Sequence, residues 1–209
     1  ATSVAPSPTR TVTRTSTATP SATAAAPTAT ATRFTSTAAL RVNAGGSQYV
    51  DSLGQTWLPD QAYRPGSWGY VGGMTYAVTR PIAGTDDDPL YQSERYNLSA
   101  YRFDVPNGRY QVTLRLAELY DTSIDRRVFD VKVEGQTVFA NVDVYRAVMA
   151  RDRAYDLSTV ADVADGQLTI EFVNKVSAAK VNALEIVYIP PSTPTATATP
   201  TNSPTATAT

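Results

Sequence analysis

The chain has neither cysteine nor histidine among its 209 residues. This excludes zinc sites of the cysteine–histidine type, cysteine–histidine dyads and serine–histidine–aspartate triads, because each needs one of these two side chains. It also excludes disulfides, so a fold of this chain must be held together by its core. We expect no bound metal and no cofactor.

The chain also carries little net charge and has no long apolar run. The net charge is −1, and no basic patch is present that would follow the phosphates of a nucleic acid. No stretch approaches the roughly 20 apolar residues that cross a membrane. The chain begins at Ala1 without a methionine and shows no signal peptide, so we expect a processed, secreted product. We therefore expect neither a nucleic-acid partner nor a membrane span.

Large apolar residues are almost absent from the two ends of the chain. Residues 1–34 and 190–209 consist mainly of Thr, Ala, Ser and Pro, and the hexapeptide Pro-Thr-Ala-Thr-Ala-Thr recurs at 27–32, 194–199 and 204–209. Such a composition cannot bury enough apolar surface to offset the entropy of ordering, and it favours extended linkers. Dense threonine also offers hydroxyls for O-glycosylation outside the cell. The candidate glycosylation sites are Thr28, Thr30, Thr32, Thr195, Thr197 and Thr199.

Between these flanks, residues 35–189 are rich in strand patterns. Residues 109–119 alternate polar and apolar side chains, which is the period of a half-buried strand. Turn signals at short intervals, without a long helical pattern, predict an all-β fold, namely an antiparallel β-sandwich of jelly-roll type. The expected strands cover residues 39–43, 100–105, 109–119, 128–133, 137–139, 167–173 and 181–189.

One segment combines a loop with aromatic residues. Residues 83–89 predict a loop, and residues 90–96 follow with two tyrosines and several polar groups. Loops on a rigid scaffold are where proteins place recognition residues. The loop also holds Asp86, Asp87 and Asp88, whose oxygens are of the type that binds calcium. The spacing of an EF-hand is missing, however, and short acidic loops are more often solvated, so we expect no metal here.

Six short motifs follow one another along residues 35–189. They are Val42–Gly46, Trp68–Gly73, Leu90–Tyr96, Leu116–Tyr120, Arg127–Val131 and Lys180–Ile186. Their order and spacing resemble the malectin family, in particular the malectin-like carbohydrate-binding modules of bacterial secreted proteins, over roughly residues 39–189. The resemblance implies a β-sandwich with a sugar site in the loops at one end. In the family, that site binds a diglucose unit through aromatic side chains and an aspartate.

The resemblance also implies which residues would form the sugar site. Tyr70, Tyr91 and Tyr120 match aromatic positions of the family. Beside Tyr120, Asp121 stands where the family has another aromatic residue, and Ser177 stands where it has the aspartate. The resemblance therefore allows a glucan as ligand, but specificity for diglucose does not follow.

The chemistry of sugars favours these residue types. A tyrosine ring covers the apolar face of a sugar, and its hydroxyl can bond at the rim. A carboxylate such as that of Glu94 accepts charge-assisted hydrogen bonds from neighbouring sugar hydroxyls. Tyrosine is also a common strand residue, and Glu94 could instead pair with Arg95 or with the sheet edge. A structural role therefore stays open for both residue types.

Two functions remain open on the sequence. The first is a non-catalytic, extracellular carbohydrate-binding domain at the cell surface, carried on O-glycosylatable flanks, with an oligosaccharide or polysaccharide as partner. Catalysis is not expected, because none of the 19 acidic residues is singled out as a member of the carboxylate pair that glycoside hydrolysis needs. The second is a repeating subunit of a glycosylated extracellular filament or sheath, assembled head-to-tail through its flanks. Residues 32–37, with Phe34 as an anchor, would then add as a strand to a neighbouring subunit.

Overall fold

Strands form where buried and exposed side chains alternate along the chain. In the computed structural model, which describes residues 39–191, β6 (Gly108–Leu116) buries Tyr110 and Val112 and turns the residue between them outward. β7 (Val128–Val133) alternates in the same way. This is the two-residue period of a strand with one face on a core. The strand patterns that the sequence shows in these two segments are confirmed.

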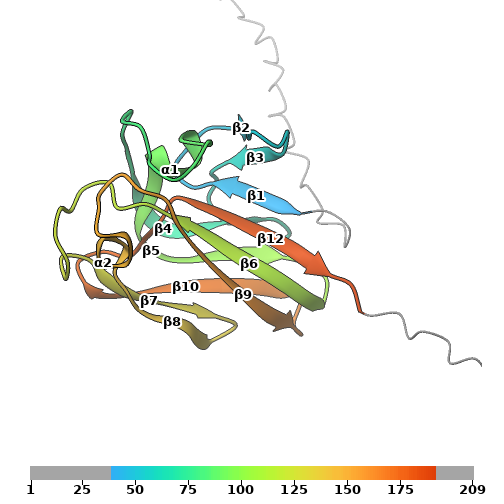
Figure 1. Ribbon diagram of the computed structural model, residues 1–209. Coiled ribbons are helices and arrows are strands. Elements are labelled where there is room, and N and C mark those ends of the chain that lie inside the picture. Colours follow the sequence, from blue (N-terminus) through green and yellow to red (C-terminus); the bar gives the residue numbers. More distant parts are fainter. Residues whose placement is uncertain (1–38, 192–209) are drawn as a thin grey trace, which may run out of the picture. The chain divides into compact units, whose positions relative to one another are not determined.

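Two sheets form a sandwich (Figure 1). The first sheet has the spatial order β2 (Tyr49–Val50), β3 (Thr56–Pro59), β1 (Leu40–Asn43), β12 (Ala183–Ile189), β6 and β9 (Tyr155–Val163). In the second sheet, β4 (Trp68–Ala77) pairs with one side of β5 (Ser93–Asp104), and the other strands are β11 (Lys180–Val181), β10 (Gln167–Val176), β7 and β8 (Gln136–Val142). Every pairing is antiparallel except that of β1 with β3. The predicted antiparallel β-sandwich is confirmed.

The core is made of large apolar side chains from both sheets. Phe103 of β5 and Phe129 of β7 are among its fully buried members. Burial of a side chain of this size contributes about 1.5–3 kcal/mol relative to exposure. A second, smaller cluster contains Trp57 of β3 and Tyr91 of the short helix α1 (Pro89–Gln92). This cluster holds α1 against the sandwich just before β5 begins.

Some strand boundaries differ from the prediction. Strand β5 already starts at Ser93, because β4, which is not among the predicted strands, pairs with it along the length of the strand. The predicted last strand, 181–189, is split at Asn182 into β11 and β12, which belong to different sheets. β9 is not among the predicted strands either. Its exposed positions carry Asp156 and Asp162, and aspartate is depleted in strands.

Helices are a minor part of the described chain. Besides α1 there is α2 (Val144–Val148), and no helix within residues 39–191 is long and apolar enough to cross a membrane. Residues 1–38 and 192–209 lie outside the described residues. The six candidate glycosylation sites and the segment 32–37 therefore stay predictions.

Candidate functional site

A pocket of about 620 Å³ opens where three pieces of chain meet. These are the paired ends of β4 and β5, the loop between β6 and β7, and the end of β10 with the turn that follows it. The volume falls within the range of about 300–1,000 Å³ that is typical of small-molecule sites. The pocket is lined by Tyr76, Glu94, Tyr96, Tyr120, Asp121, Arg126, Arg127, Val176, Ser177 and Ala178.

Three tyrosines give the pocket aromatic walls. The rings of Tyr76 and Tyr120 meet edge to face, with centroids 6.2 Å apart and an angle of 84° between their planes. Tyr120 is 68% exposed and Tyr76 is 36% exposed, so both rings offer surface to a ligand. The third, Tyr96, donates its hydroxyl to the sulfur of Met74 at 3.8 Å. Grouped aromatic surface of this kind marks an interaction site.

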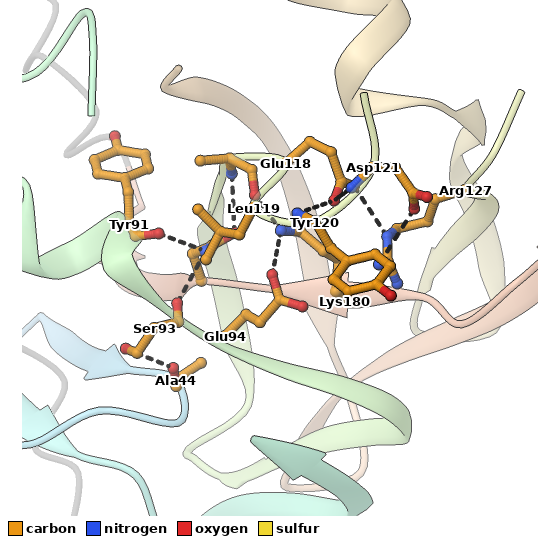
Figure 2. A network of polar contacts seen from close by, with 12 residues as sticks. Ala44, Tyr91, Ser93, Glu94, Glu118, Leu119, Tyr120, Asp121, Arg127 and Lys180 are labelled. Atoms are coloured by element: carbon orange, nitrogen blue, oxygen red, sulfur yellow. Dashed lines mark hydrogen bonds and ion pairs between the residues drawn. The ribbon is translucent and has the colours of Figure 1, made fainter. Parts of the chain in front are cut away.

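A buried ion pair supports the pocket (Figure 2). Lys180 is fully buried, and its Nζ donates to Glu94 Oε2 and to the main-chain oxygen of Ala117. Glu94 is only 2% exposed, yet it lines the pocket. Within the described chain its second oxygen, Oε1, accepts no hydrogen bond, and it is not fully enclosed. The ion pair therefore fixes Glu94 in the wall of the pocket, with one carboxylate oxygen that has no hydrogen-bond partner among the described residues.

A second buried carboxylate shapes the loop between β6 and β7 (Figure 2). Glu118 Oε1 accepts from the backbone N–H groups of Tyr120 and Asp121 at 2.9 and 3.0 Å. Its Oε2 accepts from Arg127 Nε at 2.9 Å. Arg127 in turn donates to the carbonyl oxygen of Ala178 at 2.6 Å and lies 3.5 Å from the carboxylate of Asp121. One carboxylate thus fixes two pocket residues, and one guanidinium joins this loop to the turn after β10.

The charged groups around Glu118 change the pKa of its carboxyl group. Burial by itself would raise the pKa of Glu118, but the positive charges of Lys180 and Arg127, together with the two backbone N–H groups, outweigh burial and lower it. Folding therefore favours the charged form of this carboxylate.

The lowered pKa predicts a dependence of stability on pH. Because the folded state holds Glu118 at a lower pKa than the unfolded chain does, its stabilisation is complete above the ordinary value of 4.5. It is lost as the pH falls through the lower, folded value. We expect Glu118→Gln to be less stable than the parent at neutral pH and to lose less stability on acidification, as measured by denaturant unfolding at several pH values. Glu171→Gln, at a partly exposed position of β10, is the control, and equal behaviour of the two variants would contradict this role of Glu118.

The structure brings together four of the six residues that the sequence predicted for the site. The four that line the pocket are Glu94, Tyr120, Asp121 and Ser177. Tyr70 and Tyr91 lie outside its lining. The two outliers differ in what covers them.

Tyr91 is enclosed. It is 2% exposed, its hydroxyl donates to Asp156 Oδ1 at 2.8 Å, and that hydroxyl accepts from Arg115 at 3.0 Å. Burial also raises the pKa of the hydroxyl of Tyr91. No face of the ring is free to stack on a sugar. Tyr91 therefore belongs to the support of the fold, which corrects the expectation drawn from its position in the motif.

The ring of Tyr70 is covered by a cation. The guanidinium carbon of Arg95 lies 3.3 Å from the ring centroid, and Arg95 Nε donates to Asp60 at 2.6 Å. The pairing of Glu94 with Arg95, which the sequence left open, is thus replaced by two separate ion pairs, Arg95 with Asp60 and Glu94 with Lys180. Tyr70 has no part in the pocket.

Tyr76 and Tyr96 also line the pocket, although neither is among the predicted site residues. Tyr76 of β4 stands directly opposite Glu94 of β5, and Met74 stands opposite Tyr96. Their place depends on the pairing of two strands. The local signal that could have indicated it is the alternation of large side chains at Met74 and Tyr76, which is typical of a strand.

The acidic loop 83–89 is held by hydrogen bonds within the protein. Asp87 accepts from the hydroxyl of Tyr49 at 3.0 Å and from the backbone N–H and hydroxyl of Ser52 at 2.7 and 2.9 Å. Among residues 39–191, no three side chains of the metal-binding types Asp, Glu, His and Cys gather as they would around an ion. The hydrogen bonds of Asp87 thus hold the loop against β2 and the turn that follows it.

The fold is similar to that of domains in several solved structures. A beta-glucuronidase of Bacteroides uniformis superposes with a TM-score of 0.69 at 27% identity, over 73% of this chain and 18% of that one. The ANXUR2 extracellular domain of Arabidopsis thaliana superposes with a TM-score of 0.62 at 19% identity, over 70% of this chain and 47% of that one. The second likeness shows a shared fold.

Sequence comparison gives the family. Malectin-B of Xenopus laevis is 32% identical over 136 residues, which are 62% of this chain and 47% of that protein. The chain spans about half the length of the curated relatives it matches. The family profile described as "Malectin domain" matches residues 38–188. Because that match takes in every strand from β1 to nearly the end of β12, this chain belongs to the malectin family.

Proposed function

We propose that the pocket binds a carbohydrate and that the chain is a non-catalytic, malectin-like carbohydrate-binding domain. The observation that carries the proposal is the pair of perpendicular, solvent-facing rings of Tyr76 and Tyr120 beside the carboxylates of Glu94 and Asp121. Membership of the malectin family supports it.

The lining of the pocket suits the two sides of a sugar ring. The C–H face is apolar and packs on an aromatic ring, while the hydroxyls need partners if their desolvation is to be offset. Tyr120 provides exposed ring surface. The hydroxyl of the exposed Ser177 and the carboxylate of the partly exposed Asp121 provide hydrogen-bonding groups at the same pocket. Each charge-assisted bond contributes on the order of 1.5–3 kcal/mol, which gives reversible binding when a few are combined.

The carboxylates of the pocket are arranged for binding. Glycoside hydrolysis needs one carboxylic acid to protonate the leaving group and a second carboxylate across the bond. Glu94 is bonded to Lys180, and Asp121 lies beside Arg127. Glu118 is occupied by two backbone N–H groups, and its pKa is lowered, the opposite of what a proton donor needs. We therefore propose binding without cleavage.

The ligand class follows from the same lining. An oligosaccharide or polysaccharide fits an open pocket with aromatic walls, and a glucan is the first candidate because of the family. Asp121 and Ser177 stand where the resemblance places an aromatic residue and an aspartate, so we do not narrow the ligand to diglucose. We also propose that the domain works outside the cell, on the composition of its threonine- and proline-rich flanks.

Alanine at either exposed tyrosine should weaken glycan binding. We expect Tyr120→Ala and Tyr76→Ala to lower the affinity by at least about tenfold, because each removes ring surface worth about 1.5–3 kcal/mol. A glycan array identifies the ligand, and calorimetry with that ligand measures the loss. Tyr145→Ala, at a partly buried position of α2 outside the pocket, is the matched control. Unchanged affinity in both pocket variants, or no glycan bound by the parent, would reject the proposed function.

A further inference from the structure

The free edges of the two sheets differ in how well they are protected. Among residues 39–191, β2 has only two residues, and part of the edge of β4 is covered by residues 61–63, which bond to the backbone of Tyr70. β8 pairs with β7 in a register that is broken twice. By contrast, the nine residues of β9 pair with β6 without a register shift. Long regular edges are templates for an added strand, and natural proteins usually blunt or cover them.

A groove of about 330 Å³ lies between β9 and β8. Its large apolar lining residues are Tyr155 and Leu157 of β9 and Val138 and Phe139 of β8, all of which pack against the core and yet stay partly exposed. Its polar lining residues are Asn141, Asp143 and Arg146, the last from α2. β9 and β8 are terminal strands of the two sheets (Figure 1). A strand that added to β9 would find backbone partners along the edge and, in the groove, the apolar side chains of β8 and β9 for its alternate side chains.

The chain itself supplies a segment with matching chemistry. Residues 33–37 read Arg-Phe-Thr-Ser-Thr, and Phe34 is the only aromatic residue within residues 1–38. Phenylalanine and threonine are enriched in strands, and a single aromatic ring is the kind of anchor that fills an apolar groove. The charged residues of 1–38 are all arginines. The exposed face of β9 carries the acid Asp162, which complements this charge, whereas Asp156 on the same face is already paired with Arg115.

The length of the chain excludes docking within one molecule. Leu40, the first residue of β1, aligns through β12 and β6 with Thr159 of β9. The distance from β1 to a strand added beyond β9 is four strand spacings, about 19 Å at ~4.8 Å each. The extended chain from Thr37 to Leu40 reaches at most about 11 Å. Residues 33–37 of one molecule therefore cannot lie along its own β9.

We propose that residues 33–37 of one copy of this chain add as a strand to the free edge of β9 in a second copy, with Phe34 in the groove between β8 and β9. The donor segment and the receiving edge are different surfaces, so the contact is head-to-tail and repeats into an open row of subunits. The groove shares no residue with the pocket of Tyr76 and Tyr120. The proposed assembly can therefore be tested independently of carbohydrate binding.

Because the parent has no cysteine, site-specific cross-linking gives a clean test. A full-length Ser36→Cys variant, which keeps Phe34, is mixed with a separately purified Thr159→Cys variant and treated with a short bis-maleimide. We expect a cross-linked heterodimer in high yield. The matched control pairs Ser36→Cys with Val173→Cys, an exposed position on β10 of the other sheet, and should give a several times lower yield. Equal yields from the two mixtures would overturn the proposal.

The anchor is tested by self-association of the full-length protein. Analytical ultracentrifugation over a range of concentrations should show the parent forming dimers and longer rows. Phe34→Ser should weaken this association by at least about tenfold, because an anchor residue in a fully desolvated groove dominates such a contact. Val12→Ala, a change at another apolar residue of the same flank, is the control and should associate like the parent. A parent that stays monomeric, or a Phe34→Ser variant that associates like the control, would also overturn the proposal.

Discussion

Replacing Glu94 with glutamine is expected to lower the free energy of unfolding by about 3–5 kcal/mol. Lys180 is fully buried, and Glu94 is the carboxylate that pairs with its ammonium. The amide keeps the shape of the side chain but removes the charge, so the buried ammonium of Lys180 loses its directly paired carboxylate and keeps only the longer-range attraction of Glu118. Breaking a buried pair in this way is far more harmful than replacing both partners, because the desolvation of the remaining charge is no longer fully offset. Denaturant unfolding measures the loss.

Two further variants test whether the loss of stability comes from the buried pair of Glu94 and Lys180 rather than from changing any lysine ion pair. Lys175→Met removes one partner of the ion pair between Lys175 and Asp130, in which the lysine side chain is 39% exposed. This change should alter the free energy of unfolding by no more than about 1 kcal/mol. Adding Lys180→Met to Glu94→Gln should restore part of the loss, since the stranded charge is then gone. A double variant less stable than Glu94→Gln would mean that the pair is not the source of the effect. Because Glu94 lines the pocket, glycan affinity should fall in Glu94→Gln as well.

Asn182→Ala is expected to cost at least about 3 kcal/mol of stability. The side chain of Asn182 is fully buried, and its Nδ2 donates to the carbonyl oxygens of Tyr91 and Ser93 at 2.8 and 2.9 Å. Its Oδ1 accepts from the backbone N–H of Ala117 at 2.9 Å. One amide thus joins the start of β5 to the end of β6, at the point where β11 passes into β12. Removing it strands three main-chain groups, and each buried unsatisfied group costs about 1–3 kcal/mol.

The matched control is Asn107→Ala. Asn107 is exposed and makes one bond, from Nδ2 to the carbonyl oxygen of Ala164, so its loss should be within about 1 kcal/mol. Asn182→Asp sharpens the test, because it keeps an acceptor for Ala117 but sets a carboxylate against two carbonyl oxygens. It should be no more stable than Asn182→Ala. Equal stability of the Asn182 and Asn107 variants by thermal unfolding would show that the amide is not a structural link.

The site could be predicted from the sequence only in part. Tyr120 and Glu94 belong to motifs whose positions the family resemblance fixed, Asp121 directly follows one of them, and all three line the pocket. Tyr91 sits in an equally clear motif, yet it is buried beside Asp156, because the short helix α1 turns its ring into the smaller core cluster. Tyr76 lies in no motif and lines the pocket because β4 pairs with β5. Motif membership thus says where a residue lies along the chain, and burial decides whether a ligand can reach it.

The amino-acid sequence by itself determined that this protein folds through its core, as a sandwich of strands, without thiol or imidazole chemistry. Those properties follow from composition and from the two-residue period of side chains, which are local and can be read along the chain. Which groups become partners was decided only by the tertiary structure. Lys180 meets Glu94, and within residues 39–191 no further strand lies beyond β9, because the order of the strands brings together some residues that are far apart in the chain and leaves others at the edge of a sheet.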